Sequence, residues 1–277
     1  MSLVPAAAVG RAPIGVFDSG MGGLTVLADL RRELPEDRFI YLGDTARLPY
    51  GTKTPATIIR YALQAAELLV ARGVGALVVA CNTASSVALP ALRQRFANLP
   101  VMGVIEPGAA AACALTRCGH IAVIGTESTV RGGAYERAIH AHAPQVRVSA
   151  LACQLFVALA EEDWVDGPAV SAVAHRYLDR WLADLGQRPD VLVLGCTHFP
   201  VLASAIAAVT GSGIALVDSA RTSAAAVRDL WLPGAPAPAL PAGVEFLATD
   251  GVERFARIGG RFLGTQLRVE QVELVEL

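Results

Sequence analysis

Two cysteines occupy matching positions in the sequence, each just after a short apolar run. Cys81 follows residues 76–80, and Cys196 follows residues 191–194 with one glycine between. A thiolate can remove a proton and a thiol can deliver one, so such a pair can do acid–base chemistry. At a strand-to-helix junction, the helix N-terminus is expected to lower a thiol's pKa from about 8.5. We expect the other three cysteines to be structural: Cys113, Cys118 and Cys153.

Polar residues also follow the other apolar runs. Asp18 and Ser19 follow residues 14–17, and Thr126 follows residues 120–124. The carboxyl ends of parallel strands form the ligand crevice of an open α/β sheet, so these side chains are expected to gather in one polar site. His198, two residues after Cys196, is expected to tune that thiol's proton.

A glycine-rich turn, residues 18–23 (DSGMGG), separates the first expected strand from the first expected helix. Its backbone amides can bind a carboxylate, and Asp18 can assist a neighbouring base. The turn has neither the G-x-G-x-x-G pattern nor the P-loop pattern, so it gives nucleotide binding little support.

Short apolar runs alternate with amphipathic segments from end to end. We expect strands at residues 14–17, 39–42, 76–80, 101–105, 120–124, 146–151, 191–194, 214–217, 244–248 and 267–273, and helices at residues 55–72, 168–185 and 252–263. This alternation predicts an α/β fold of βαβ units with mainly parallel sheets flanked by helices. Ten strands are many for one such sheet, so we expect two domains.

Two distant segments have the same plan. Residues 77–83 and 191–198 each contain an apolar strand, a small residue, a cysteine and polar residues, and each is followed by a helix that carries a proline, Pro90 or Pro200. This likeness suggests two similar halves. The apolar stretch 191–217 is long enough to raise the question of a membrane span, but Pro200 and the 211–213 turn interrupt it. We interpret it as buried parallel-sheet structure.

Bulk composition excludes several classes of protein. The 277 residues carry 23 Lys+Arg against 25 Asp+Glu, which predicts neither a nucleic-acid partner nor a membrane partner. The single lysine, Lys53, excludes pyridoxal-phosphate chemistry unless Lys53 itself forms the Schiff base. Five cysteines without disulfide-framework or metal-ligand spacing favour a reducing cytoplasm, and residues 1–12 lack the pattern of a signal peptide.

Taken together, the motifs resemble those of the glutamate racemases of bacterial cell-wall synthesis, within the wider aspartate/glutamate racemase superfamily. The matching stretches, in the family's order, are residues 15–25 (GVFDSGMGGLT), 44–51 (DTARLPYG), 80–85 (ACNTAS), 105–109 (IEPGA), 125–126 (GT), 195–200 (GCTHFP) and 217–220 (VDSA). The resemblance spans most of the chain.

The resemblance implies two similar α/β domains with the active site in the cleft between them. Mapped here, residues 1–104 with 213–277 form the first domain and residues 105–212 form the second. By match, Cys81 takes the α-proton of D-glutamate and Cys196 that of L-glutamate, with Asp18 assisting Cys81 and His198 and Glu161 assisting Cys196. The residues expected to bind substrate are Asp18, Ser19, Pro49, Tyr50, Gly51, Cys81, Asn82, Thr83, Thr126, Cys196, Thr197 and His198.

The resemblance further implies an enzyme with no cofactor and no metal that supplies D-glutamate for peptidoglycan, with a homodimer as a possible assembly. Two features depart from the family's pattern. Gln154 stands where proline is usual, and residues 233–243 form an Ala/Pro-rich segment expected to be an added surface loop.

Three alternatives remain open from the sequence. The substrate could be aspartate or another small amino acid. The chain could be a binding module that closes over an amino acid without reacting, although binding alone needs no paired thiols. A zinc site could form from Cys81, Cys196, His198 and Asp18.

Overall fold

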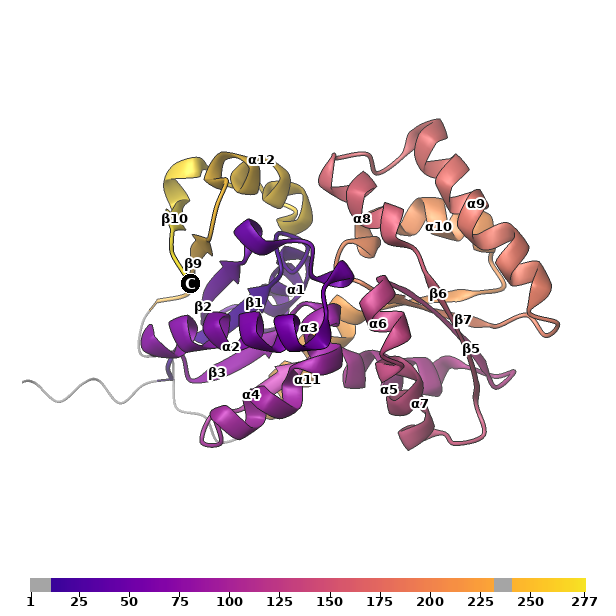
Figure 1. Ribbon diagram of the computed structural model, residues 1–277, viewed down its shortest axis with the longest axis horizontal. Coiled ribbons are helices and arrows are strands. Elements are labelled where there is room, and N and C mark those ends of the chain that lie inside the picture. The colour runs from indigo at the N-terminus through magenta and orange to yellow at the C-terminus, as the bar shows by residue number, and fades with distance from the viewer. Residues whose placement is uncertain (1–10, 232–240) are drawn as a thin grey trace, which may run out of the picture.

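The structure is a computed structural model that describes residues 11–231 and 241–277. Strands and helices alternate along it (Figure 1). The strands are β1 (Ile14–Asp18), β2 (Arg38–Gly43), β3 (Ala76–Val79), β4 (Val101–Gly103), β5 (His120–Gly125), β6 (Arg147–Ala152), β7 (Val191–Gly195), β8 (Ala215–Asp218), β9 (Gly243–Ala248) and β10 (Val272–Leu274). The α-helices are α1 (Leu24–Glu33), α2 (Pro55–Ala71), α3 (Asn82–Val87), α4 (Leu89–Arg95), α5 (Ile105–Leu115), α6 (Glu127–Arg131), α7 (Ala134–His142), α8 (Gln154–Glu161), α9 (Gly167–Asp184), α10 (Ala203–Thr210), α11 (Ser219–Trp231) and α12 (Val252–Leu263). Four short 3₁₀ turns accompany them: η1 (Thr45–Arg47), η2 (Tyr50–Thr52), η3 (Phe199–Leu202) and η4 (Val269–Gln271).

Local sequence explains these elements. All five residues of β7, Val-Leu-Val-Leu-Gly, are buried, as expected of a parallel strand covered on both faces. Helix α2 begins where the Thr54 side chain accepts a hydrogen bond from the Thr57 amide, with Pro55 in the first turn. Strong local signals of this kind explain why the three expected helices and eight of the ten expected strands are confirmed to within one residue or two.

Two expected strands were too long. The strand expected at residues 101–105 ends at Gly103, because Ile105 begins α5. The strand expected at residues 267–273 is mostly turn: η4 precedes β10, which covers only Val272–Leu274.

The strands form two sheets in which every pairing is parallel. The six-stranded sheet has the order β10-β9-β2-β1-β3-β4, and the four-stranded sheet has the order β6-β5-β7-β8. The run β2-β1-β3-β4 therefore has the same order as β6-β5-β7-β8, with β3 and β7 in equivalent places. This match confirms the expectation of an α/β fold with two similar halves, which lie side by side in Figure 1.

The boundary expected near residue 213 is wrong for one strand. β8 pairs with β7, and Val193 lies opposite Val217, so residues 215–218 belong to the second sheet. The apolar residues of β8 complete that sheet at the edge beyond β7. We therefore propose that the second domain extends to Asp218, with the first domain made of both ends of the chain.

Each sheet is covered by helices on both faces. In the first sheet, α1, α11 and α12 pack on one face and α2, α3 and α4 on the other. In the second sheet, Val191 and Val193 face α5 and α7, whereas Leu192 and Leu194 face α8, α9 and α10. This alternation leaves the carboxyl ends of the strands as the place where polar side chains can gather.

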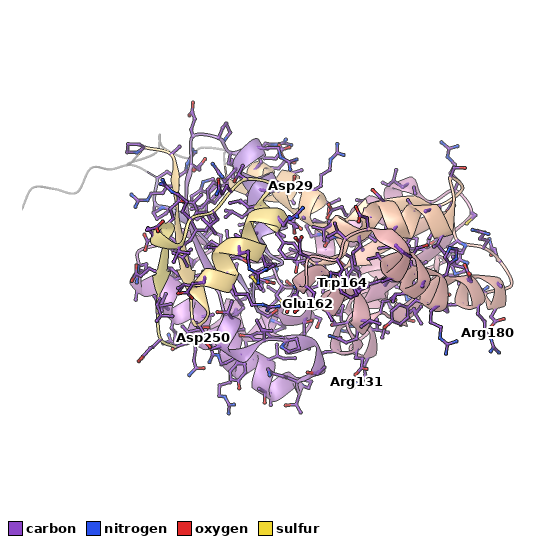
Figure 2. The ribbon with its side chains drawn as sticks, turned by 90° about the horizontal axis from the view of Figure 1, so that it is seen from above. Asp29, Arg131, Glu162, Trp164, Arg180 and Asp250 are labelled. Carbon is purple, nitrogen blue, oxygen red and sulfur yellow. The ribbon has the colours of Figure 1, made fainter. Side chains whose placement is uncertain are left out.

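Within the described ranges, no helix is both long and apolar enough to cross a membrane. Residues 233–240 of the expected surface loop lie outside the described part of the chain, and Gly243 at its end begins β9. In Figure 2, Glu162 and Trp164 lie at the middle of the molecule, where the two halves meet, and Arg180 lies at the far end of the second half.

Replacing Phe156 with alanine is expected to destabilise the second half. The ring is fully buried and makes edge-to-face contacts with Phe199 and Tyr177, at centroid distances of 5.4 and 5.2 Å. Loss of a buried aromatic ring costs about 3–5 kcal/mol. The neighbouring change Leu155→Ala is the control: this side chain is 46% exposed, so about 0.5 kcal/mol is expected. Denaturant unfolding measures both, and equal losses would contradict the packing described.

Candidate active site

Both cysteines lie at carboxyl ends of strands, at the border between the two sheets. Cys81 follows β3 and caps α3, and Cys196 follows β7 and precedes η3. They line one cavity together with residues from both halves: Ser19, Leu48, Pro49, Tyr50, Gly51, Asn82, Thr83, Thr126, Gln154, Val157, Glu161, Thr197 and His198. The equivalent places of β3 and β7 in their sheets thus bring two thiols to one small space.

The cavity is nearly closed. Its volume is about 20 Å³, which leaves room for about one water molecule. An amino acid is several times larger than water, so the cavity in this structure is too small to hold one. Among the described residues that line the cavity, His198 is the one side chain able to carry a positive charge.

The Cys81 thiol is shielded from water and lies beside negative charge. It is 4% exposed, donates to Ser19 Oγ at 3.5 Å, and accepts from the Ala84 amide at 3.4 Å. Burial and then the Asp18 charge raise its pKa to about 12, although the Ser19 and Ala84 hydrogen bonds act in the opposite direction. The expectation of a lowered thiol pKa at Cys81 is therefore wrong, because loss of water outweighs the helix N-terminus.

Asp18 is fully buried at the end of β1, the strand beside β3. Its Oδ2 accepts from the Gly20 amide at 3.1 Å, while its Oδ1 has no hydrogen-bond partner among the described residues. Burial raises the pKa of Asp18, and the charge of His198 and the amides of the 18–23 turn only partly offset this. Gly23 has no room for a side chain, since a Cβ there would lie 2.5 Å from the Asp18 Cβ.

Cys196, His198 and Glu161 form a relay of polar contacts. The Cys196 Sγ lies 3.7 Å from His198 Nδ1, and His198 Nε2 lies 3.1 Å from Glu161 Oε1. Burial opposes protonation of His198, but its hydrogen bonds to Cys196 and Glu161 and their charges raise its pKa to about 10. Burial also disfavours ionised Glu161, yet His198 and Arg254 lower the pKa of that carboxyl overall. The imidazole is therefore placed to exchange a proton with the Cys196 sulfur.

First-half residues hold the His198 ring in place. A Cβ on Gly22 would lie 2.5 Å from both His198 Nδ1 and Thr197 Oγ1, so the turn packs directly against this pair. Phe262 of α12 meets the ring edge-to-face at a centroid distance of 5.3 Å. The catalytic candidates of the second half are thus ordered by segments of the first.

The η1–η2 segment forms a third wall. The Tyr50 hydroxyl donates to Asp44 Oδ2, and Asp44 also accepts from Arg47 Nε at 2.7 Å and from Thr249 Oγ1 at 3.0 Å. Asp44 is fully buried and ties this segment to the sheet. A Cβ on Gly51 would lie 2.7 Å from the Thr126 Cβ, so the segment also contacts the second half.

Hydrogen bonds join the two halves around the thiols. Thr83 Oγ1 and Thr126 Oγ1 are 2.9 Å apart, with Thr126 capping α6. The Asn82 side chain donates to Ser219 Oγ at 3.3 Å and accepts from the Tyr135 hydroxyl at 2.7 Å. One N–H of Asn82 remains for another acceptor. The Thr83–Thr126 and Asn82–Tyr135 contacts thus join the two halves beside the thiols.

All the residues expected to act in catalysis or binding line this cavity except Asp18, which lies behind Cys81. Leu48, Val157 and Gln154 also line the cavity, and the sequence did not predict them there. Asp44 lies behind Tyr50 and follows β2 directly, at the strand end that its place in the stretch 44–51 predicts, although no role was expected for it. Gln154 Oε1 is buried with no partner among the described residues, and only its departure from the usual proline could have drawn attention to it.

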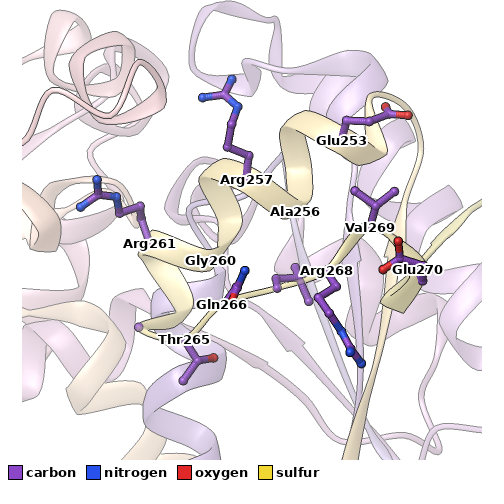
Figure 3. Close-up of a pocket in the computed structure, with 12 residues that line it drawn as sticks. Glu253, Ala256, Arg257, Gly260, Arg261, Thr265, Gln266, Arg268, Val269 and Glu270 are labelled. Carbon is purple, nitrogen blue, oxygen red and sulfur yellow. The ribbon is translucent and has the colours of Figure 1, made fainter.

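The largest other hollow described here does not bring reactive side chains together in this way. A hollow of about 910 Å³ lies between α12 and the segment after it, but Arg257, Arg261 and Arg268 point away from one another there (Figure 3). In residues 11–231 and 241–277, no three His, Cys, Asp or Glu side chains are grouped as metal ligands. The four residues considered for zinc therefore do not form a site of that kind.

Comparisons with known proteins agree with this arrangement. A family model described as Asp/Glu/hydantoin racemase matches residues 23–227. A glutamate racemase from Geobacter metallireducens is 48% identical over 94% of this chain and 96% of that protein, and one from Koribacter versatilis is 42% identical over 96% and 98%. A glutamate racemase structure from Bacillus anthracis has a TM-score of 0.89 at 36% identity, covering 96% of this chain and 98% of that one. The Francisella tularensis enzyme, solved with D-glutamate, has a TM-score of 0.85 at 35% identity over the same shares.

Replacing Gly22 with alanine is expected to displace His198. The added methyl group would overlap the imidazole and the Thr197 hydroxyl, and overpacking of this kind costs about 1–3 kcal/mol. The nitrogen chemical shifts of the His198 ring and the thermal unfolding midpoint should both change. Gly20→Ala is the matched control, since its Cβ meets nothing nearer than Leu48 at 3.5 Å. Unchanged His198 resonances in the Gly22 variant would contradict the contact.

Replacing Asp18 with asparagine is expected to lower the thiol pKa of Cys81. The change removes a nearby negative charge that disfavours thiolate, so thiolate forms at lower pH than in the wild type. Ultraviolet thiolate absorbance, taken as the difference between each protein and its Cys81→Ala counterpart, measures the titration. An unchanged titration would mean that burial alone sets the basicity of Cys81.

Proposed function

The chain belongs to the Asp/Glu/hydantoin racemase family, and from this premise we propose that it interconverts L- and D-glutamate. The observation that carries the proposal is the pair of buried thiols, one from each half, on a single closed cavity. Curated relatives of the same length are glutamate racemases, and they match over most of the chain. Racemisation needs a base on one face of the α-carbon and an acid on the other, and two thiols can exchange these roles.

The reaction removes a very weakly acidic proton, so the base must be strong. A thiol whose pKa is about 12 gives a far stronger base, once deprotonated, than a water-exposed thiol. In the proposed mechanism, Cys81 removes the α-proton of D-glutamate and the Cys196 thiol delivers a proton to the opposite face. The reverse reaction starts with Cys196 and L-glutamate.

The proton partners of the two thiols differ. The buried Asp18 carboxylate sits beside Cys81 and favours its protonated form after each transfer. The His198 imidazole, 3.7 Å from Cys196, supplies or accepts a proton on the other side, and Glu161 stabilises the imidazolium. These roles are those that the sequence resemblance implies; the contacts of His198 support them on the Cys196 side, and the effect of the Asp18 charge on the Cys81 pKa supports them on the other.

Neutral donors are proposed to bind the two carboxylates of glutamate. Hydroxyl groups line the cavity, as do the Asn82 amide with its remaining N–H and two residues of the η2 turn, Tyr50 and Gly51. Such fixed donors also stabilise the negative charge that develops on the substrate as the α-proton leaves. The hydroxyl-bearing residues of this set are Ser19, Thr83, Thr126 and Thr197.

We propose catalysis without pyridoxal phosphate, since Lys53 does not line the cavity. We also propose that the enzyme works in a reducing cytoplasm, where its thiols stay free. Its product, D-glutamate, would be used for peptidoglycan. The homodimer remains a prediction from the resemblance alone.

Side-by-side racemisation assays with glutamate and aspartate test the choice of substrate. Aspartate is expected to react more slowly, because its shorter side chain would not bring its distal carboxylate to the donors proposed to bind that of glutamate.

Single replacements of the thiols test the mechanism. Neither Cys81→Ala nor Cys196→Ala should racemise glutamate, because each lacks the group that serves one face. In deuterated water, the remaining thiol can still remove and return a proton on its own side. Cys81→Ala is expected to exchange the α-proton of L-glutamate slowly with retention and leave D-glutamate untouched, and Cys196→Ala to show the reverse. Exchange is followed by proton NMR of each enantiomer.

Cys153 provides the control. It is buried but does not line the cavity, so Cys153→Ala should keep both racemisation and exchange. A one-base mechanism would give another pattern, in which one variant keeps substantial racemisation while the other loses all of it. That result would sink the two-thiol mechanism.

A further inference from the structure

Arg254 of α12 reaches across from the first half to the relay of the second. Its Nη1 lies 3.6 Å from Glu161 Oε2, and its Nη2 donates to the Glu161 carbonyl oxygen at 3.0 Å. The same Nη2 lies 3.1 Å from Glu162 Oε1. One guanidinium thus contacts both the side chain and the main chain of the residue that hydrogen-bonds His198.

The position of Glu161 explains why it needs such a partner. Glu161 is the last residue of α8, where carbonyl groups lack helical donors and the helix dipole is negative. A carboxylate there is disfavoured, and its side chain is only 12% exposed. Arg254 supplies a donor to the free carbonyl and a positive charge beside the carboxylate. The contact with the carboxylate restricts the rotation of the Glu161 side chain, and the contact with the carbonyl fixes Arg254 beside it.

We propose that Arg254 is a positioning residue for the Cys196 side of the reaction: it holds Glu161 against His198, and thereby holds His198 against the Cys196 sulfur. This role rests on the proposed function. Arg254 itself touches neither the thiols nor the cavity, since it does not line it. Its effect reaches the Cys196 sulfur through the Glu161–His198 contact of 3.1 Å and the His198–Cys196 contact of 3.7 Å.

The neighbouring arginines of α12 separate this role from a general effect of charge. Arg257 is exposed and projects away from the helix (Figure 3). Arg261 forms an ion pair with Asp163 at 2.8 Å, which also joins α12 to the second half but does not involve Glu161. Figure 1 shows α12 facing α8 across the border between the halves. The matched changes Arg257→Gln and Arg261→Gln therefore remove a charge, or a cross-half ion pair, without touching the relay.

The test compares isotope effects for the two enantiomers in Arg254→Gln. The enantiomers are equal in free energy, so kcat/KM must fall equally in both directions, and a fall of about 10- to 100-fold is expected. The isotope effects need not change together. With α-deuterated L-glutamate, the impaired Cys196 removes the deuteron, so the effect on kcat/KM should rise above the wild-type value. With α-deuterated D-glutamate, Cys81 removes the deuteron, and delivery of a proton by Cys196 becomes rate-limiting. The isotope effect on kcat/KM should therefore fall below the wild-type value.

Control variants make the result specific. Arg254→Lys keeps a charge and should recover part of the lost kcat/KM, while Glu162→Gln, Arg257→Gln and Arg261→Gln should keep wild-type isotope effects on both enantiomers. Thermal unfolding midpoints of all variants are measured alongside, because a purely structural defect would lower activity without opposite shifts in the two isotope effects.

Two results would overturn the role of Arg254: isotope effects in Arg254→Gln that match the wild type, or the same opposite shifts in Arg261→Gln. A wild-type protein without racemase activity would instead overturn the proposed function, and the role of Arg254 with it. The two failures are distinguishable because the first requires an active wild-type enzyme.

Discussion

Exclusion of water from the two thiols is the condition on which the rest of the structure depends. A thiol in water is too weak a base, once ionised, for the α-proton of an amino acid, whereas burial raises the pKa of Cys81 to about 12. To be buried so completely, the thiols must be covered by other residues on every side. The 18–23 turn, the η1–η2 segment and the ends of both sheets provide this cover, and the remaining cavity holds about one water molecule.

The two thiols follow equivalent strands, but the residues that surround each thiol differ. β3 and β7 occupy the same place in sheets of matching order, and the cysteines that follow them both line one cavity. Cys81 then faces a buried carboxylate, while Cys196 faces an imidazole backed by Glu161. The fold therefore supplies a nearly symmetric frame, and the charges within it differ in sign on the two sides. In the proposed mechanism, the forward and reverse reactions share one path but start from different bases, Cys81 for D-glutamate and Cys196 for L-glutamate.

Features with local signals could be predicted from the sequence, and those that depend on distant contacts could not. The strands and the two strand-end cysteines follow from apolar runs and their polar ends. The pKa of Cys81 depends on how completely the folded chain covers it, so the expected lowering was wrong. β8 was assigned to the wrong half, since no local pattern tells which sheet a strand joins. The Arg254–Glu161 contact joins residues 93 positions apart, with no pattern that pairs them.

The first sheet is built from both ends of the chain, and this sets an order for folding during synthesis. β9 and β10 pair beside β2, so the six-stranded sheet cannot be completed until the C-terminal residues have left the ribosome. Until then β2, with its apolar sequence Phe39–Leu42, is an unprotected edge that could pair with another chain. The four strands of the second sheet are contiguous and emerge earlier, so that half can fold first. α12 emerges after both cysteines, and a nascent or truncated chain without it would carry both cysteines yet lack the cover over His198.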